Sequence, residues 1–366
     1  MLKIGNRSKL PEETLPSAAD DQSGAGLVDR FGRVATDLRL SVVDKCNLRC
    51  SYCMPAEGMP WIPPQMLMTA EEIARLVRVG HHELGVEELR LTGGEPLVRK
   101  DLENIVARVR ADCPDLPISM TTNAVGLDRR AKTLHDAGVT RINVSLDSLH
   151  PETFAALTRR PLLSQVLDGV QAADEAGFGP IKINAVLLRG INDHEAPALL
   201  EWALQGGYEL RFIEHMPLDG DRAWREDNMI SASEIRELLS KRFTLTPDPQ
   251  LRGGAPAERF EVRRAGADTD TTRLGWVGLI SSVTEPFCAA CTRTRITAEG
   301  RVRSCLFSHE ETDLLAVMRG GGSDADIARD WSDAMWRKPR AHGSESVGLA
   351  SADFVQPARS MSAIGG

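Results

Sequence analysis

The sequence predicts an α/β fold whose strands form an incomplete barrel, and three observations carry that prediction. From Leu38 to Met216, six short strand-like segments alternate with helical stretches, which is typical of βαβ units and a parallel sheet. Each segment alternates apolar with polar residues, so one face of the sheet is apolar and the other polar. From about Arg259 onward, short strands and turns replace this rhythm. We therefore expect an incomplete (β/α)6 barrel of the TIM type, followed by a C-terminal extension.

Strands are expected over residues 38–43, 88–92, 118–123, 141–147, 181–188 and 209–216. Thr69-Ala70-Glu71-Glu72 has the pattern of a capping box and begins a helix that runs to about Leu84. Ser231-Ala232-Ser233-Glu234 begins another helix after the last of these strands. In the extension we expect a strand over 273–280, a hairpin over 295–307 and two short helices over 311–319 and 324–337.

Composition divides the chain into four parts. Residues 1–35 are polar and form a lead-in that is expected to be disordered. Residues 36–245 form the barrel, and residues 246–340 form the extension, which carries three cysteines. Residues 341–366 are rich in Ser, Ala and Gly, end in Gly-Gly, and are expected to form a flexible tail.

The polar face of the predicted sheet carries several cations, among them Arg39, Arg90, Lys182 and Arg211. A standard (β/α)8 barrel fills its interior with Val, Ile and Leu. Because inward cations are costly to bury without a partner, we expect this lumen to hold an anionic ligand. A half-solvated antiparallel sheet would also alternate polar with apolar residues, but the helices between the strands argue against it.

Charge and hydropathy narrow the class of protein. The 366 residues are enough for one large α/β domain or two smaller units. The net charge of -8 argues against broad nucleic-acid binding, which needs a basic surface. The sequence has no apolar run long enough to span a membrane and no apolar signal core at its N-terminus. We therefore expect a cytoplasmic protein that binds neither nucleic acid nor membrane.

Six of the seven cysteines fall into two closely spaced triplets. Clustered cysteines in a chain that is not exported indicate metal binding rather than disulfides. Iron–sulfur cubanes are normally held by four thiolates, so a cubane held by three leaves one iron open to a small molecule. A zinc site completed by a distant fourth ligand is the alternative. The first triplet is C-x3-C-x2-C at Cys46, Cys50 and Cys53, and the second is C-x2-C-x13-C at Cys288, Cys291 and Cys305. The seventh cysteine, Cys113, is expected to be a partly buried free thiol.

The first triplet resembles the cluster loop of the radical S-adenosylmethionine (SAM) superfamily, which has an aromatic residue before the last cysteine, here Tyr52. Gly93-Gly94-Glu95-Pro96 follows the second expected strand and is similar to the segment that meets the amino group of SAM in that superfamily. The resemblance implies that Cys46, Cys50 and Cys53 hold a catalytic [4Fe–4S] cluster whose open iron binds SAM. One electron from the cluster then cleaves SAM and yields a 5′-deoxyadenosyl radical.

The second triplet and its surroundings narrow the resemblance from a superfamily to one family. Thr292-Arg293-Thr294-Arg295 lies between Cys291 and Cys305, and the chain ends in Gly365-Gly366. From about Leu38 to the end, the chain resembles the GTP 3′,8-cyclase family of molybdenum cofactor (molybdopterin) biosynthesis. The resemblance implies that a second [4Fe–4S] cluster binds the guanine of GTP and that the terminal Gly-Gly enters the active site. In that family the radical removes the 3′ hydrogen of the ribose, and the carbon radical attacks C8, giving (8S)-3′,8-cyclo-7,8-dihydroguanosine 5′-triphosphate.

The same resemblance assigns roles to residues at matching positions. Those that would bind SAM are Tyr52, Gly94, Ser145 and Met216. Those that would contact GTP are Arg39, Arg90, Thr121, Lys182, Arg293, Thr294 and Arg295, with Arg211 as a further candidate. Arginine binds phosphate in a bidentate manner, and lysine adds a point charge. His309 and His215 are not expected to be ligands, because the family leaves an iron open for the substrate.

The family also implies partners. They are a reductive electron donor of the flavodoxin or ferredoxin type, the downstream cyclic pyranopterin monophosphate synthase, and a second copy of the chain in a homodimer. Two other interpretations stay open at this point. Another radical SAM enzyme with an auxiliary cluster, such as a peptide-modifying one, would also use two cysteine groups. A non-enzymatic zinc protein would use the cysteines structurally.

Overall fold

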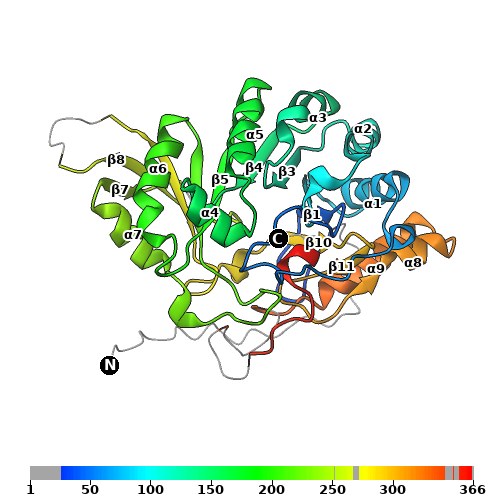
Figure 1. Cartoon of the computed structure of the whole chain (residues 1–366). Helices are drawn as coiled ribbons and strands as arrows, with labels where there is room; N and C mark the ends of the chain where they lie inside the picture. Colours follow the sequence, from blue (N-terminus) through cyan, green and yellow to red (C-terminus); the bar gives the residue numbers. More distant parts are fainter. Residues whose placement is uncertain (1–25, 251, 267–271, 343–348, 350–353, 365–366) are drawn as a thin grey trace.

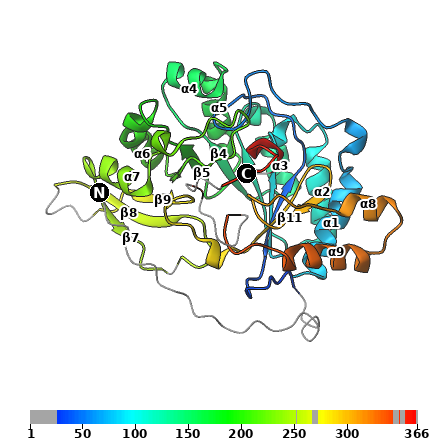
Figure 2. The same cartoon turned by 90° about the horizontal axis from the view of Figure 1, so that it is seen from below.

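In the computed structural model, residues 26–250, 252–266, 272–342, 349 and 354–364 are described. Within these residues twelve strands form one sheet, in the order β12-β11-β10-β1-β2-β3-β4-β5-β6-β9-β8-β7. The sheet is curved, and most of the helices lie on its outer side (Figures 1 and 2). Because β12 and β7 stand at opposite ends of the order without pairing, the barrel is open.

The six strands of the predicted barrel are confirmed as a parallel series. They are β1 (Asp37–Ser41), β2 (Glu88–Thr92), β3 (Ile118–Thr122), β4 (Arg141–Ser145), β5 (Lys182–Val186) and β6 (Glu209–Ile213). The helices that follow them are α1 (Ala70–His82), α2 (Leu102–Asp112), α3 (Ala131–Ala137), α4 (Pro151–Thr158), α5 (Leu163–Glu175), α6 (Ala196–Gln205) and α7 (Ala232–Ser240). Most of the strands end one to three residues earlier than expected, where the chain leaves the sheet for the loops of the site.

Both predicted capping boxes are present. At the start of α1, the Thr69 hydroxyl accepts the Glu72 N–H, and the Glu72 carboxylate accepts the Thr69 N–H. Ser231 and Glu234 make the same reciprocal pair at the start of α7. These pairs satisfy N–H groups that the first turn of a helix leaves without intrahelical partners.

The extension adds strands to both ends of the barrel series. Beyond β6 lie β9 (Gly275–Ile280), which is parallel to it, and then the antiparallel β8 (Glu258–Arg264) and β7 (Phe243–Pro247). Beyond β1 lie β10 (Arg293–Ile296), which is parallel to it, and then the antiparallel β11 (Arg301–Arg303) and β12 (Thr312–Asp313). The expected strand, hairpin and two helices are confirmed, although α8 begins at Leu314 rather than residue 311. β7 was not expected, and it crosses the domain boundary drawn at residue 245.

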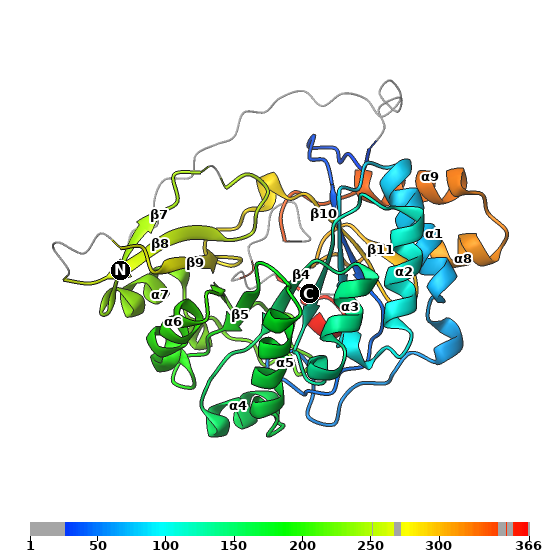
Figure 3. The same ribbon diagram turned by 90° about the horizontal axis from the view of Figure 1, so that it is seen from above.

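The helices of the extension, α8 (Leu314–Arg319) and α9 (Asp324–Trp336), pack beside α1 (Figure 3). Trp331 of α9 is fully buried, and its Nε1 donates to the Thr294 hydroxyl of β10 at 2.9 Å. Its ring lies so close to Gly80 of α1 that a Cβ there would come within 3.0 Å of it. The hydrophobic core therefore runs without interruption from the barrel into the extension.

Part of the segment assigned to the disordered lead-in is ordered. Val28 and Val34 form an antiparallel bridge, and Leu27 and Ala35 are buried in the main core. The prediction of disorder was therefore wrong for residues 26–35, where two apolar side chains find partners that the local sequence does not show. Residues 1–25 lie outside the described part of the chain.

The described part of the tail packs against the body of the protein. Ile364 is fully buried and joins Leu218, Phe307 and Leu349 in a second, small core. A short 3-10 helix, η7 (Met361–Ala363), precedes it. The expectation of a flexible tail did not foresee this packing, and Gly365-Gly366 lie outside the described residues. Figures 2 and 3 place this C-terminal segment, drawn in red, on the inner side of the curved sheet.

The described residues contain no helix with the length and hydropathy needed to cross a lipid bilayer.

The capping box of α1 gives a stability prediction. Thr69→Ala removes the hydroxyl that accepts the Glu72 N–H, and loss of such a cap costs about 1 kcal/mol of unfolding free energy. Urea denaturation measures the change. Ser240→Ala, at the exposed end of α7, is the control and should change the free energy by less than about 0.5 kcal/mol. Equal stability of Thr69→Ala and the unchanged protein would contradict the role of the cap.

Candidate active site

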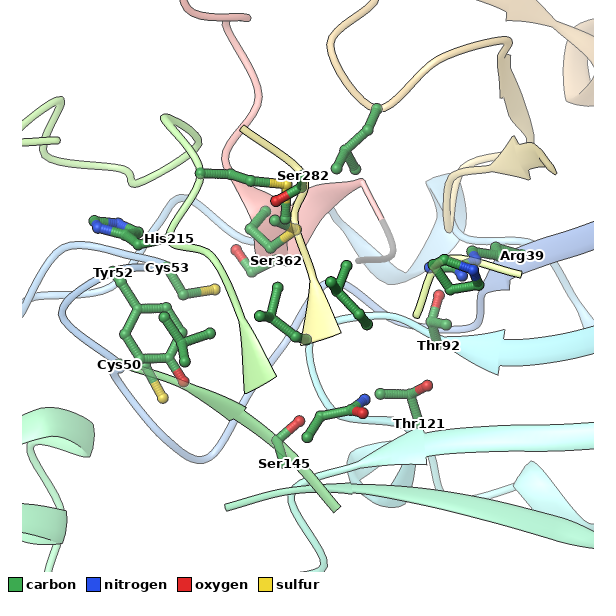
Figure 4. Close-up of a pocket in the computed structure, with 18 of the residues that line it drawn as sticks. Arg39, Cys50, Tyr52, Cys53, Thr92, Thr121, Ser145, His215, Ser282 and Ser362 are labelled. Carbon is green, nitrogen blue, oxygen red and sulfur yellow. The ribbon is translucent and has the colours of Figure 1, made fainter. Parts of the chain in front are cut away.

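A cavity of about 330 Å³ lies inside the curve of the sheet and brings the two cysteine triplets together. All six of these cysteines line it, as do polar side chains of the barrel strands. Figure 4 shows Cys50, Tyr52 and Cys53 on one side of the cavity and Arg39 on the opposite side. The first triplet follows β1, so it lies at the carboxyl end of the barrel strands, where barrel enzymes carry their active sites.

The loop of the first triplet is held by arginine side chains. Arg49 donates to the carbonyl of Cys46 at 2.6 Å, and Arg159 donates to the carbonyl of Met54 at 2.9 Å. The three thiols are free. Burial and then the Glu95 carboxylate raise the pKa of Cys46 to about 11, and burial and then Cys46 raise the pKa of Cys53 to about 12. Three unpaired thiols that influence one another at a cavity fit a bound iron–sulfur cluster.

Gly93 and Gly94 are required by the fold of this loop. A Cβ at Gly93, whose φ is 144°, would lie 2.3 Å from the carbonyl oxygen of Val43. A Cβ at Gly94 would lie 2.4 Å from the carbonyl oxygens of Asp44 and Lys45. The two glycines thus let the end of β2 approach the backbone that leads into the first triplet. Only glycine lets the end of β2 pack there.

Glu95 is committed to the protein's own hydrogen bonds. Its carboxylate accepts from the Leu97 N–H at 3.0 Å, the Thr122 hydroxyl at 2.6 Å and the Asn123 N–H at 2.6 Å. Burial raises its pKa to about 7 against these bonds. Glu95 therefore ties the loop after β2 to the end of β3, beside the first triplet.

The second triplet lies at the amino end of β10. Cys288 lies in η6 (Cys288–Ala290), Cys291 follows it, and Cys305 comes just after β11. Burial raises the pKa of Cys288, and the nearby Cys305 and Cys291 raise it further. At Cys291 burial is outweighed by Arg293 and Lys338, which lower the pKa to about 6. The two triplets therefore differ in electrostatic environment.

The register of β10 brings its arginines into the barrel. Arg293 is paired with Asp37, and Arg295 is paired with Arg39 of β1. Nε and Nη2 of Arg293 and Nε of Arg295 are buried, and none of them has a hydrogen-bond partner among the described residues. Buried donors without partners are costly, so these groups fit an anionic ligand in the cavity.

Thr294 is the one proposed GTP contact whose side chain faces away from the cavity. It is fully buried, and its hydroxyl accepts from Trp331 on the opposite face of β10. Successive side chains of a strand point to opposite faces, so Arg293 and Arg295 cannot share a face with the residue between them. The Thr294 side chain therefore does not line the cavity, and the predicted contact of Thr294 with GTP stays a prediction.

The other predicted positions line the same cavity, except for Lys182. Cavity-lining residues include Tyr52, Gly94, Ser145 and Met216 from the SAM set and Arg39, Arg90, Thr121 and Arg211 from the GTP set. Lys182 is not among the lining residues, but it lies two residues before the lining Asn184 and so shares its face of β5. Burial and then Arg211 lower the pKa of Lys182 to about 8.

Sequence reasoning missed the acidic partners of the inward cations. Asp37, Glu88 and Glu209 begin β1, β2 and β6, each two residues before an arginine. The nitrogen–oxygen distances within these pairs are 3.9 Å for Asp37–Arg39, 3.0 Å for Glu88–Arg90 and 2.7 Å for Glu209–Arg211. The lumen is therefore acidic at the amino ends of the strands and cationic above them. The signal was visible as an acid-x-Arg pattern repeated in three strands.

Residues from several other segments also reach the cavity. Ser362 of the tail lines it and hydrogen-bonds to the Cys53 thiol. His215 is 8% exposed, and neither ring nitrogen has a hydrogen-bond partner in the described part of the chain. Burial lowers its pKa to about 4, so the ring is neutral at pH 7.

Two other residues considered in the sequence lie outside the cavity lining. His309 is exposed, and Cys113 is fully buried at the end of α2.

The packing of Gly94 generates a prediction about cluster assembly. Gly94→Ala would force the loop after β2 away from the backbone of Asp44 and Lys45, at a cost of about 1–3 kcal/mol. The variant should lose iron at the first triplet and retain it at the second. Iron and acid-labile sulfide per chain after anaerobic reconstitution measure this. Full iron binding at both triplets would contradict the proposed packing role.

Comparison with known proteins gives matches along nearly the whole chain. Residues 40–203 match the radical SAM superfamily, and residues 208–344 match the family described as Molybdenum Cofactor Synthesis C. A GTP 3′,8-cyclase of Paenarthrobacter nicotinovorans is 65% identical over 96% of this chain and 100% of its own length. A GTP 3′,8-cyclase of Mycolicibacterium smegmatis is 51% identical over 96% of both chains.

Among solved structures, SuiB of Streptococcus suis bound to S-adenosylmethionine has a TM-score of 0.54 at 16% identity. The match covers 78% of this chain and 65% of that one, and it extends to the fold alone. Members of the radical SAM superfamily use SAM and a [4Fe–4S] cluster, and the first triplet, with Gly93 and Gly94 beside it in the cavity lining, fits both. The chain belongs to the GTP 3′,8-cyclase family of the radical SAM superfamily.

Proposed function

We propose that this chain converts GTP into (8S)-3′,8-cyclo-7,8-dihydroguanosine 5′-triphosphate, an early step of molybdenum cofactor biosynthesis. The observation that carries the proposal is the single cavity lined by both cysteine triplets, with unpartnered arginine donors beside the second. The names of the similar proteins support the choice of GTP as the substrate. A SAM-dependent site alone would need neither the second triplet nor the arginines.

Each triplet would hold one [4Fe–4S] cluster. Cys46, Cys50 and Cys53 would hold the first beside SAM, with Tyr52, Gly94, Ser145 and Met216 around it. Cys288, Cys291 and Cys305 would hold the second beside the guanine of GTP. When bound, the first cluster and SAM supply the radical that takes the 3′ hydrogen from the ribose.

The residues of the lumen would bind and orient GTP. Arg293 and Arg295 have free donors for the triphosphate, and Arg39, Arg90, Arg211 and Lys182 extend the cationic surface down the barrel. Thr121 adds a hydroxyl between them and the first triplet. Cyclisation joins two parts of one molecule, so its rate depends on how firmly ribose and guanine are held in orientation. Arginines fixed by Asp37, Glu88 and Glu209 provide that rigidity.

The remaining assignments rest on family membership alone. We propose a flavodoxin- or ferredoxin-type electron donor and the cyclic pyranopterin monophosphate synthase as the enzyme that takes the product. A homodimer and a cytoplasmic location are proposed on the same ground.

Anaerobic turnover tests the function. The reconstituted protein is incubated with SAM and dithionite, with and without GTP, and the products are analysed by mass spectrometry. A GTP-dependent product of unchanged mass and shifted retention, formed together with 5′-deoxyadenosine, is expected. Cys50→Ala should abolish SAM cleavage, whereas Cys291→Ala should keep basal cleavage and form no cyclic product. Cyclase activity in both variants would contradict the assignment of the two triplets.

Thr294 and Arg293 provide a matched pair of variants on one strand. Thr294→Val removes the acceptor for Trp331 and should lower the unfolding free energy by about 1–3 kcal/mol, with GTP affinity unchanged. Arg293→Met should weaken GTP binding by roughly tenfold or more, the effect of one charge-assisted hydrogen bond. Urea denaturation and equilibrium dialysis with GTP separate the two effects. Weaker GTP binding by Thr294→Val would show that the Thr294 side chain contributes to GTP binding.

A further inference from the structure

Lys338 is a buried cation beside the second triplet that the sequence analysis did not single out. It lies two residues after the end of α9 and is 2% exposed. Its Nζ lies 3.3 Å from Cys291 Sγ, 2.9 Å from the Arg293 carbonyl oxygen and 3.4 Å from the Cys291 carbonyl oxygen. The side chain thus reaches from the segment after α9 to Cys291, a proposed cluster ligand, and to Arg293, the first residue of β10.

The geometry around Nζ matches a charged ammonium. An ammonium carries three N–H donors and no acceptor, and three acceptors surround this nitrogen. A buried charge needs a counter-charge, yet no described carboxylate forms an ion pair with Lys338. The remaining candidate is the sulfur of Cys291, which is a thiolate when it ligates iron.

A second cation holds the same region from the other side. Arg33 donates to the Cys288 carbonyl at 2.8 Å and to the carbonyls of Pro339 and Arg340 at 2.8 Å and 2.9 Å. Arg33 is itself fixed by Asp29. The segment that begins with Lys338 is therefore fastened to both Cys288 and Cys291, and the Lys338 side chain cannot swing away without breaking these contacts.

We propose that Lys338 is a positioning residue of the second iron–sulfur cluster. Through its N–H···S bond to Cys291, Lys338 offsets the negative charge of the cluster and raises the reduction potential of the cluster. The proposal rests on the second cluster of the proposed function. Reduction adds one negative charge to the cluster, and a buried cation at hydrogen-bond distance stabilises the reduced form more than the oxidised one. Net charge and hydrogen bonds to sulfur are established determinants of cluster potentials.

The same side chain links the cluster to the substrate strand. Because Nζ also donates to the Arg293 carbonyl, it fixes Cys291 relative to β10, whose Arg293 and Arg295 side chains line the cavity. Loss of Lys338 should therefore have two separable effects. One is electrostatic, on the potential, and the other is positional, on how tightly iron is retained.

The test uses full-length protein in which Cys46, Cys50 and Cys53 are changed to Ala, so that only the second cluster is present. In this background Lys338→Met removes the charge at similar side-chain length, and Lys338→Arg retains it. Lys132→Met is the matched control, because Lys132 is an exposed lysine paired with Asp136 on α3. Electron paramagnetic resonance during a redox titration gives the potential, and iron loss to a chelator gives retention.

For Lys338→Met we expect the reduced-to-oxidised ratio at the parent midpoint to fall by about tenfold, which is a shift of 59 mV for a one-electron couple. Iron loss should be several times faster. Lys338→Arg should retain most of the parent potential, and Lys132→Met should match the parent in both measurements. If Lys338→Met does not fold, as judged by circular dichroism, Lys338→Gln is titrated in its place, and a shift of the same sign is expected.

An unchanged potential in a folded, cluster-loaded Lys338→Met protein would overturn the proposal, even if its stability falls. A parent protein that binds no iron at Cys288, Cys291 and Cys305 would overturn the second cluster of the proposed function, and the role of Lys338 with it. Iron content of the parent protein thus distinguishes the two failures.

Discussion

The parallel pairing of β10 with β1 is the contact on which the site depends. The first triplet follows β1, and the second triplet lies at the amino end of β10, although about 240 residues separate the two triplets in the chain. Their pairing sets Arg293 beside Asp37 and Arg295 beside Arg39. Trp331 holds the outer face of β10 against α9, and Lys338 holds its beginning. Without this pairing, each triplet would belong to a separate half of the protein.

Charge is graded along the lumen. Carboxylates lie at the amino ends of β1, β2 and β6, and arginines lie above them. The first triplet lies at the carboxyl ends of the barrel strands, and the second triplet lies at the amino end of β10. Each partial ion pair lowers the cost of burying an arginine while leaving donors on it for another anion. Side chains that are already held in place also lose less conformational freedom when a ligand arrives. The lumen is thereby suited to a highly charged anion.

How far the sequence predicted this arrangement depended on the range of the interactions. Alternation of apolar and polar residues identified all six barrel strands, and Thr69 and Ser231 marked helix starts, because these signals are local. Motif resemblance identified the six cysteines and ten other lining residues, while the rest of the lining was not predicted. Pairing of β10 with β1 was not predicted, since it joins distant segments, and without it the face of Thr294 could not be assigned. Lys338 and the ordered residues 26–35 were missed for the same reason, as their partners lie far away in the chain.

Because Ser362 of the tail meets Cys53 of the first loop, the site cannot be completed until the chain has been made as far as Ser362. About 300 residues separate these two positions, and a ribosome adding about 5–20 residues per second takes roughly 15–60 s to cover them. Until residues 288–305 have been made, the first three thiols have neither the second triplet nor the tail to cover them. Enclosure of the first triplet is therefore ordered in time, and it is complete only after the tail has been made.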